Sequence, residues 1–310
     1  MYEDFFALKE KPFGVNPDPR FLFSTDETEE ALACLTYGVI DRRGFIQLTG
    51  EVGTGKTTIL NLFLDWLSES NVPTAFVFNP RLGVEEFFDY VLADFGIACE
   101  SPSKGQKLTR LNDWLLEGYR MKKTAVLVID EAQDLSTELL EETRLLTNLE
   151  THTEKLIQIV LSGQPELEEK LRQPELRQLR QRITLRCQTR ALTLEETIRY
   201  ISSRLSIAGR KGDSPFSPSA IVEIYKHSGG IPRLINLLCD HALIASYAEG
   251  RLMVTGRCVE GIASEFDFQS SEVLKGRLSD NGHKGTQIAK RTEDKPAIEG
   301  QLRPLEGEDS

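Results

Sequence analysis

Residues 50–58 read GEVGTGKTT, a glycine-rich segment between the run GFIQLT at 44–49 and the run ILNLFLDWL at 59–67. The first run is typical of a strand and the second of a helix, so the order strand, loop, helix is predicted. Glycines let several backbone N–H groups of a loop approach one ligand, and the following helix turns the positive end of its dipole toward the same point. The segment therefore predicts a phosphate-binding loop.

The spacing of this loop matches the pattern G-x-x-x-x-G-K-[ST] at Gly50, Gly55, Lys56 and Thr57. Lys56 would reach the β- and γ-phosphates of ATP, and Thr57 would hold Mg²⁺. A chance glycine-rich turn is the alternative, and the strand–loop–helix context argues against it. The expected nucleotide-binding residues of the loop are Gly50, Glu51, Val52, Gly53, Thr54, Gly55, Lys56, Thr57 and Thr58.

Residues 124–133, TAVLVIDEAQ, place two carboxylates directly after another apolar run. An acidic residue at the carboxyl end of a strand lies where α/β sheets bind ligands. Asp130 would orient Mg²⁺ or its water, and Glu131 would polarise the attacking water. The alternative, that both acids only begin the next helix as partners of its dipole, is weakened because the two motifs occur together. The presence of Glu131 predicts hydrolysis as well as binding.

Polar residues also follow the next two predicted strands. In LIQIVLSGQPEL, Gln164 would contact the γ-phosphate or the water, or it simply begins a turn before Pro165. In PELRQLRQRITLRC, an arginine would project into the ATP site of a neighbouring subunit and stabilise the transferring charge. The candidates are Arg177, Arg180 and Arg182, and a solvated basic face is the alternative for each of them.

A further arginine, Arg233, follows GGIP at 229–232 and lies in the first turn of a predicted helix. A cation at this position opposes the helix dipole. An anionic partner such as the γ-phosphate would compensate for that, so a binding role is favoured over a surface arginine.

The hydrophobic pattern divides the chain into parts. Five short apolar runs at 44–50, 74–79, 124–130, 156–163 and 183–187 alternate with helical segments, which predicts parallel strands with helical crossovers. The predicted fold class is α/β, a P-loop NTPase three-layer sandwich followed by a small all-helical lid domain. The tail is too polar to offset the entropy of ordering. The predicted parts are an N-terminal segment packing on the ATPase core (1–40), the ATPase domain (41–190), the helical lid (191–268) and a disordered tail (269–310).

The composition is that of an acidic protein of 310 residues, with a net charge of −11. No apolar run reaches the ~18 residues of a membrane helix, and no basic-then-apolar leader opens the sequence. Five scattered cysteines without a CxxC spacing are typical of reduced thiols. We therefore expect a cytoplasmic protein without direct membrane insertion. The acidic total opposes nonspecific nucleic-acid binding, yet residues 170–211 carry eleven Lys/Arg against three Glu.

With these motifs in place, the sequence resembles the AAA+ ATPases, specifically those of the ExeA/GspA type, over about residues 1–265. The runs that carry the resemblance are MYEDFFALKEKPFGVNPDPRFLF, GFIQLTGEVGTGKTT, VLVIDEAQDL, IVLSGQPEL, LRQRI and GGIPRLIN, in this order. The opening run and SGQPEL make the match specific. The resemblance implies Lys56 and Thr57 in Walker A, Asp130 and Glu131 in Walker B, Gln164 as sensor 1, Arg182 as the arginine finger and Arg233 as sensor 2.

Two functions are compatible with this resemblance. Secretion ExeA proteins look like this domain with an added transmembrane helix and a peptidoglycan-binding domain, and shorter relatives occur beside exosortase and exopolysaccharide systems. This implies an ATP-dependent homo-oligomer, a ring or a filament, that acts on a protein partner in secretion or export and reaches the inner membrane only through that partner. Similar ATPases of the TniB/TnsC type regulate transposition on DNA, which is the alternative. A scaffold without turnover is a third interpretation, against which Glu131 argues.

Overall fold

The computed structural model describes residues 1–14, 18–78, 81–99 and 103–265. Its contacts divide the chain into two compact units, one spanning Asn16–Ala191 and the other combining Met1–Val15 with Leu192–Ser310. The predicted disordered tail at 269–310 lies outside the described residues. Among the residues described, no helix has both the length and the apolar character needed to cross a bilayer.

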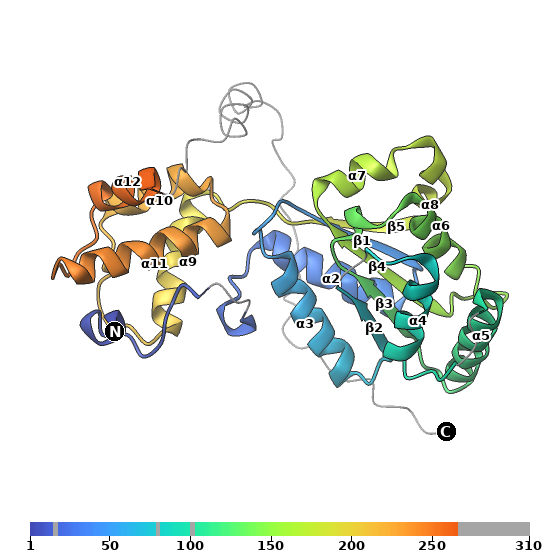
Figure 1. Cartoon of the computed structure of the whole chain (residues 1–310). Coiled ribbons are helices and arrows are strands. Elements are labelled where there is room, and N and C mark those ends of the chain that lie inside the picture. Colours follow the sequence, from blue (N-terminus) through green and yellow to red (C-terminus); the bar gives the residue numbers. More distant parts are fainter. Residues whose placement is uncertain (15–17, 79–80, 100–102, 266–310) are drawn as a thin grey trace, which may run out of the picture. The chain divides into compact units, whose positions relative to one another are not determined.

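The larger unit is built on a five-stranded parallel sheet in the order β2-β3-β4-β1-β5 (Figure 1). All five strand predictions are confirmed. The strands are β1 (Phe45–Thr49), β2 (Thr74–Val77), β3 (Ala125–Ile129), β4 (Ile157–Gly163) and β5 (Ile183–Gln188). Every residue of β1, β3 and β4 is buried, as expected for parallel strands covered on both faces.

Helices cover both faces of this sheet, so the predicted three-layer sandwich is confirmed (Figure 1). One layer contains α2 (Asp26–Ile40) and α3 (Lys56–Glu69), which pack on Ile46, Leu48, Val126, Val128 and Val160. The other contains α4 (Val84–Asp94), α5 (Lys104–Arg120), α6 (Thr137–Leu146), α7 (Pro165–Leu171) and α8 (Arg177–Arg182), which pack on Phe45, Leu127, Ile129, Ile159 and Leu161. Alternate side chains of the strands therefore serve opposite layers. Short 3₁₀ helices lie at η1 (Pro19–Phe21), η2 (Ala132–Asp134) and η3 (Pro174–Leu176).

In the second unit, the described residues from Leu194 to Glu265 form helices and their connections, as predicted. Its helices are α9 (Leu194–Ile207), α10 (Pro218–Ser228), α11 (Pro232–Ala248) and α12 (Gly256–Glu265). Thr193 and Glu196 form the expected capping box of α9. Ser217 caps α10, which ends at Gly229 in the left-handed conformation, so the local start and stop signals determine these boundaries.

The N-terminal segment departs from the prediction that residues 1–40 pack on the ATPase core. Residues up to Val15 belong to the helical unit, where α1 (Tyr2–Phe5) packs on α11. The rings of Phe5 and Tyr247 lie 5.4 Å apart, and the Tyr2 hydroxyl donates a hydrogen bond to Asp240. The aromatic opening needs an apolar partner surface, and α11 supplies it. Only η1 and α2 remain with the sheet.

Candidate functional site

The glycine-rich loop lies between the end of β1 and the start of α3, as predicted. Gly53 has φ = 82° and Gly55, the residue before α3, has φ = 103°. Glycine adopts this left-handed conformation without the steric penalty of a side chain. No side chain caps α3, so its first N–H groups are available to an anion.

The tip of β5 supports this loop through Thr189. The Thr189 hydroxyl lies 2.6 Å from the Thr54 hydroxyl, which in turn donates to the Glu51 carbonyl at 2.7 Å. A Cβ on Gly50 would lie 2.0 Å from Thr189 Oγ1, so only glycine fits there. The sequence pattern did not reveal Thr189, because its role comes from strand β5 lying beside the loop.

Lys56 is buried at the base of the loop. Its Nζ donates to the carbonyl oxygens of Gly50 at 2.7 Å and Glu51 at 3.0 Å. Burial lowers the pKa of Lys56, and the nearby charges of Glu131 and Asp130 oppose this. The ammonium group is therefore held by replaceable carbonyl contacts close to the two carboxylates.

Asp130 lies directly after β3 and is only 9% exposed. Its Oδ1 accepts hydrogen bonds from the Ser162 hydroxyl at 2.7 Å and the Glu131 backbone N–H at 3.0 Å. Burial raises the pKa of Asp130, although the Ser162 hydrogen bond and the charge of Lys56 act against this. Thr57 is an exposed residue at the start of α3. A carboxylate and a hydroxyl are the oxygen donors that Mg²⁺ prefers, so the donor set fits this ion.

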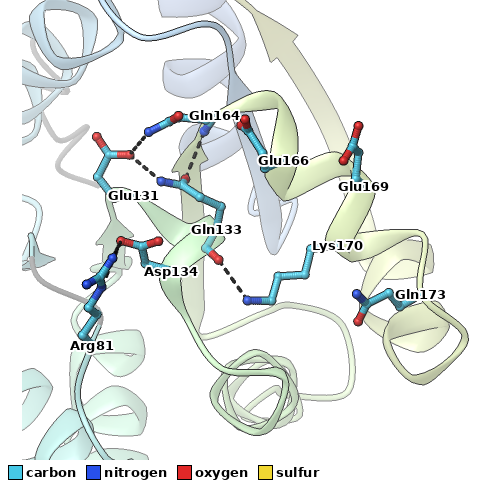
Figure 2. Close-up of a pocket in the computed structure, with 9 residues that line it drawn as sticks. All are labelled: Arg81, Glu131, Gln133, Asp134, Gln164, Glu166, Glu169, Lys170 and Gln173. Carbon is cyan, nitrogen blue, oxygen red and sulfur yellow. Dashed lines mark hydrogen bonds and ion pairs between the residues drawn. The ribbon is translucent and has the colours of Figure 1, made fainter.

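Glu131 and Gln164 come together from neighbouring strands, β3 and β4 (Figure 2). Glu131 Oε2 accepts hydrogen bonds from Gln133 Nε2 at 2.6 Å and from Gln164 Nε2 at 3.2 Å. These residues border an open, largely polar pocket of about 690 Å³. Gln133 was not identified from the sequence, although it stands two residues after Glu131 in the same run.

Within its own chain Arg182 lies away from the carboxyl ends of the strands, where the glycine-rich loop and Glu131 are. It directly precedes β5, which begins at Ile183 and runs parallel to β1. Its Nη1 donates to Thr147 Oγ1 and Asn148 Oδ1, both at 2.7 Å, at the C-terminal end of α6. The neighbouring Arg177 and Arg180 are exposed on α8. The assignment of the arginine finger among the three stays a prediction.

Arg233 is the second residue of α11 in the helical unit and is exposed. No side chain caps this helix N-terminus. Gly230 just before it is needed for packing, since a Cβ there would lie 2.0 Å from the Leu192 carbonyl oxygen. The role of Arg233 as sensor 2 stays a prediction.

Sequence comparisons agree with the resemblance inferred above. Residues 40–171 match the family model described as AAA domain. Over 279 residues the chain is 42% identical to General secretion pathway protein A of Aeromonas hydrophila, and the alignment covers 87% of this chain and 50% of that relative. The chain thus spans about half the length of this relative. The predicted resemblance to AAA+ ATPases of the ExeA/GspA type is confirmed.

Several solved structures share the fold. The ORC2 protein of Aeropyrum pernix has a TM-score of 0.59 at 17% identity, covering 88% of this chain and 79% of that one. Drosophila ORC bound to DNA has a TM-score of 0.62 at 17% identity, with coverages of 86% and 66%. The RuvB Holliday junction branch migration motor of Thermotoga maritima has a TM-score of 0.51 at 17% identity, with coverages of 84% and 79%. At these identities the likeness concerns the fold alone.

Proposed function

Because residues 40–171 form an AAA domain and the chain is related in sequence to General secretion pathway protein A, we propose that it binds and hydrolyses MgATP. One observation carries the proposal. The buried Lys56 contacts the loop carbonyls of Gly50 and Glu51, and Asp130 and Glu131 follow β3 in the same parallel sheet, near enough for their charges to oppose the lowering of the Lys56 pKa. A cation below a glycine-rich loop after β1 and two acids after β3, with β4 between these strands, are parts that recur in phosphoryl-transfer sites.

The loop would bind the phosphates of ATP through its backbone N–H groups and the N-terminus of α3. Lys56 would exchange the carbonyl oxygens of Gly50 and Glu51 for oxygens of the β- and γ-phosphates. Thr57 and Asp130 would hold Mg²⁺, which neutralises phosphate charge when it is bound.

Hydrolysis would depend on Glu131. Its carboxylate would polarise a water molecule and accept a proton as the water oxygen bonds to the γ-phosphorus and the bond to the β–γ bridging oxygen breaks. The contact between Gln164 and Glu131 supports a role for Gln164 at the γ-phosphate or the water. ADP and phosphate would be the products.

We further propose that ATP is bound at the interface of a homo-oligomer, with an arginine supplied by the neighbouring subunit. Arg182 is the residue implied by the family resemblance, and its contacts with Thr147 and Asn148 would then have to open. The exposed Arg177 and Arg180 need no such release. Position on α8 thus supports all three arginines, and of these Arg182 is the one that would have to give up contacts in its own chain.

The relation to General secretion pathway protein A supports a protein partner in secretion or exopolysaccharide export, with the chain acting in the cytoplasm and reaching the inner membrane through that partner. Binding of DNA is the alternative. The basic stretch at 170–211 supports it less than its charge indicates, because several of its arginines have intramolecular partners. Arg190 pairs with Glu27 at 2.7 Å, and the buried Arg204 contacts Tyr200.

The test measures phosphate release and particle size for the wild type, Lys56→Ala and Glu131→Gln. We expect Lys56→Ala to abolish ATP binding, and Glu131→Gln to retain binding, lose turnover and accumulate as ATP-bound oligomers. Unchanged turnover in Glu131→Gln would remove this residue from the mechanism. Repeating the size measurement with duplex DNA at two salt concentrations separates the two partners, because binding to several phosphates weakens steeply with salt.

A further inference from the structure

The side-chain amide of Gln133 connects the segment after β3 with the segment after β4, beside the Glu131 carboxylate. Gln133, in η2 after β3, donates from Nε2 to Glu131 Oε2 at 2.6 Å. Its Oε1 accepts from the backbone N–H of Gln164, at the start of α7, at 3.0 Å (Figure 2). The Gln133 amide therefore links the tip of β3 to the tip of β4, and its N–H donor holds the Glu131 carboxylate.

The surroundings of Gln133 are shaped to keep it in place. A Cβ on Gly163 would lie 2.7 Å from Gln133 Oε1, so the glycine leaves the room that this oxygen occupies. Lys170 Nζ donates to the backbone carbonyls of Gln133, at 2.9 Å, and of Leu135. These contacts fix both the side chain and the main chain of the turn.

Glu131 needs such support because of its own backbone. It has φ = 51°, in the left-handed region that non-glycine residues seldom adopt. Two amide donors, from Gln133 and Gln164, bind the same oxygen, Oε2. Within the described residues Oε1 accepts no hydrogen bond, so this oxygen is left to interact with a water molecule.

We propose that Gln133 is a positioning residue for ATP hydrolysis, which holds the Glu131 carboxylate so that Oε1 takes the proton of the attacking water. The proposal rests on the ATPase function proposed above. Glutamine suits this position because it donates and accepts at the required reach. Glutamate would place a like charge against Glu131, asparagine is one methylene too short, and methionine matches the length but offers no N–H donor.

The test compares Gln133→Met with the wild type and with Gln173→Met. Gln173 lines the same pocket and is exposed, so the second variant is a matched control for the same substitution. We expect Gln133→Met to lower kcat at least about tenfold, the effect of losing one hydrogen bond to a charged group, while KM for ATP and Tm stay close to wild type. Gln133→Glu, which keeps the shape, should lower kcat as well, and Gln173→Met should not.

Turnover in Gln133→Met within twofold of the wild type would overturn the proposal, as would a parallel change in KM and Tm that marks a merely structural role. If the wild type itself releases no phosphate, the proposed function fails and the contact is tested without nucleotide. Thermal unfolding of Gln133→Met, Glu131→Met and the double variant should then show Tm shifts that are not additive. Additive shifts would show that Gln133 does not act on Glu131.

Discussion

Removing the Thr189 hydroxyl should loosen the glycine-rich loop at 50–58, although no residue of the loop is mutated. Thr189 lies at the tip of β5, where its hydroxyl meets that of Thr54 at 2.6 Å. Thr189→Ala removes this hydroxyl together with a methyl group, whereas Thr189→Ser removes the methyl group alone. The difference between the two variants therefore measures the hydrogen bond.

The structure sets the size of this difference. The Thr54 hydroxyl keeps its bond to the Glu51 carbonyl in both variants, so no buried polar group is left without a partner. The loss is then that of one neutral hydrogen bond, about 1 kcal/mol. If the loop must recover its conformation to bind phosphate, the Kd for ATP should be about fivefold weaker in the alanine variant than in the serine variant.

Calorimetric titration with MgATP measures this ratio, with Glu131→Gln present in every protein to prevent turnover. Thr184 provides a matched control on the same strand, since its hydroxyl bonds to the Arg43 and Phe45 carbonyls at the far end of β5. Alanine and serine at position 184 should bind ATP equally well. Equal affinity of the two Thr189 variants would refute the reasoning that the β5 tip organises the loop.

Two further predictions concern Arg182 and Asp130. Mixing Lys56→Ala subunits with Arg182→Ala subunits should restore part of the ATPase activity if Arg182 acts on a neighbour. Recovery only with Arg177→Ala or Arg180→Ala would assign the arginine finger to that residue instead. Arg182→Ala alone should also lower Tm, because the C-terminal end of α6 loses the hydrogen bonds that Arg182 donates to Thr147 and Asn148. Asp130→Asn should raise the Tm of the nucleotide-free protein at neutral pH while abolishing turnover, and an unchanged or lower Tm would count against a destabilising buried carboxylate.

Features encoded locally could be predicted from the sequence. The five strands follow from short apolar runs, and the loop follows from the fixed spacing of Gly50, Gly55 and Lys56. The capping box at Thr193 determines where α9 begins. In each case the signal lies within a few consecutive residues, so no knowledge of the tertiary contacts is needed.

Features that depend on partners distant in the sequence could not be predicted. The aromatic opening shows that residues 1–14 need an apolar surface, but not that α11 provides it. Thr189 and Gln133 gain their roles because the strands β5, β1, β4 and β3 lie side by side. The sequence offers Arg182 as an arginine-finger candidate, but it does not reveal the hydrogen bond that Arg182 donates to Thr147 in its own chain.

The buried charges should make the nucleotide-free protein less stable than the protein with MgATP bound. Burial raises the pKa of Asp130 and lowers that of Lys56, so in the nucleotide-free protein both shifts favour the neutral form. For Asp130 the folded state binds more protons than the unfolded state between the usual carboxylate range and the raised pKa. Its contribution to stability therefore falls as the pH rises through that window, and the deficit persists at neutral pH.

The contribution of Lys56 to stability changes with pH in the opposite direction, but at neutral pH its burial also destabilises the nucleotide-free protein. Because its pKa is lowered, its charged form is disfavoured in the folded state, and this penalty is relieved only as the pH rises from that lowered pKa to the usual pKa of lysine. Phosphate oxygens beside Lys56 and a divalent cation beside Asp130 would each favour the charged forms. MgATP should therefore raise the Tm of the wild type more than that of Asp130→Asn, whose site no longer gains from the cation. Equal increases would mean that Asp130 does not interact with the bound metal, and the assignment of Asp130 as its ligand would have to be withdrawn.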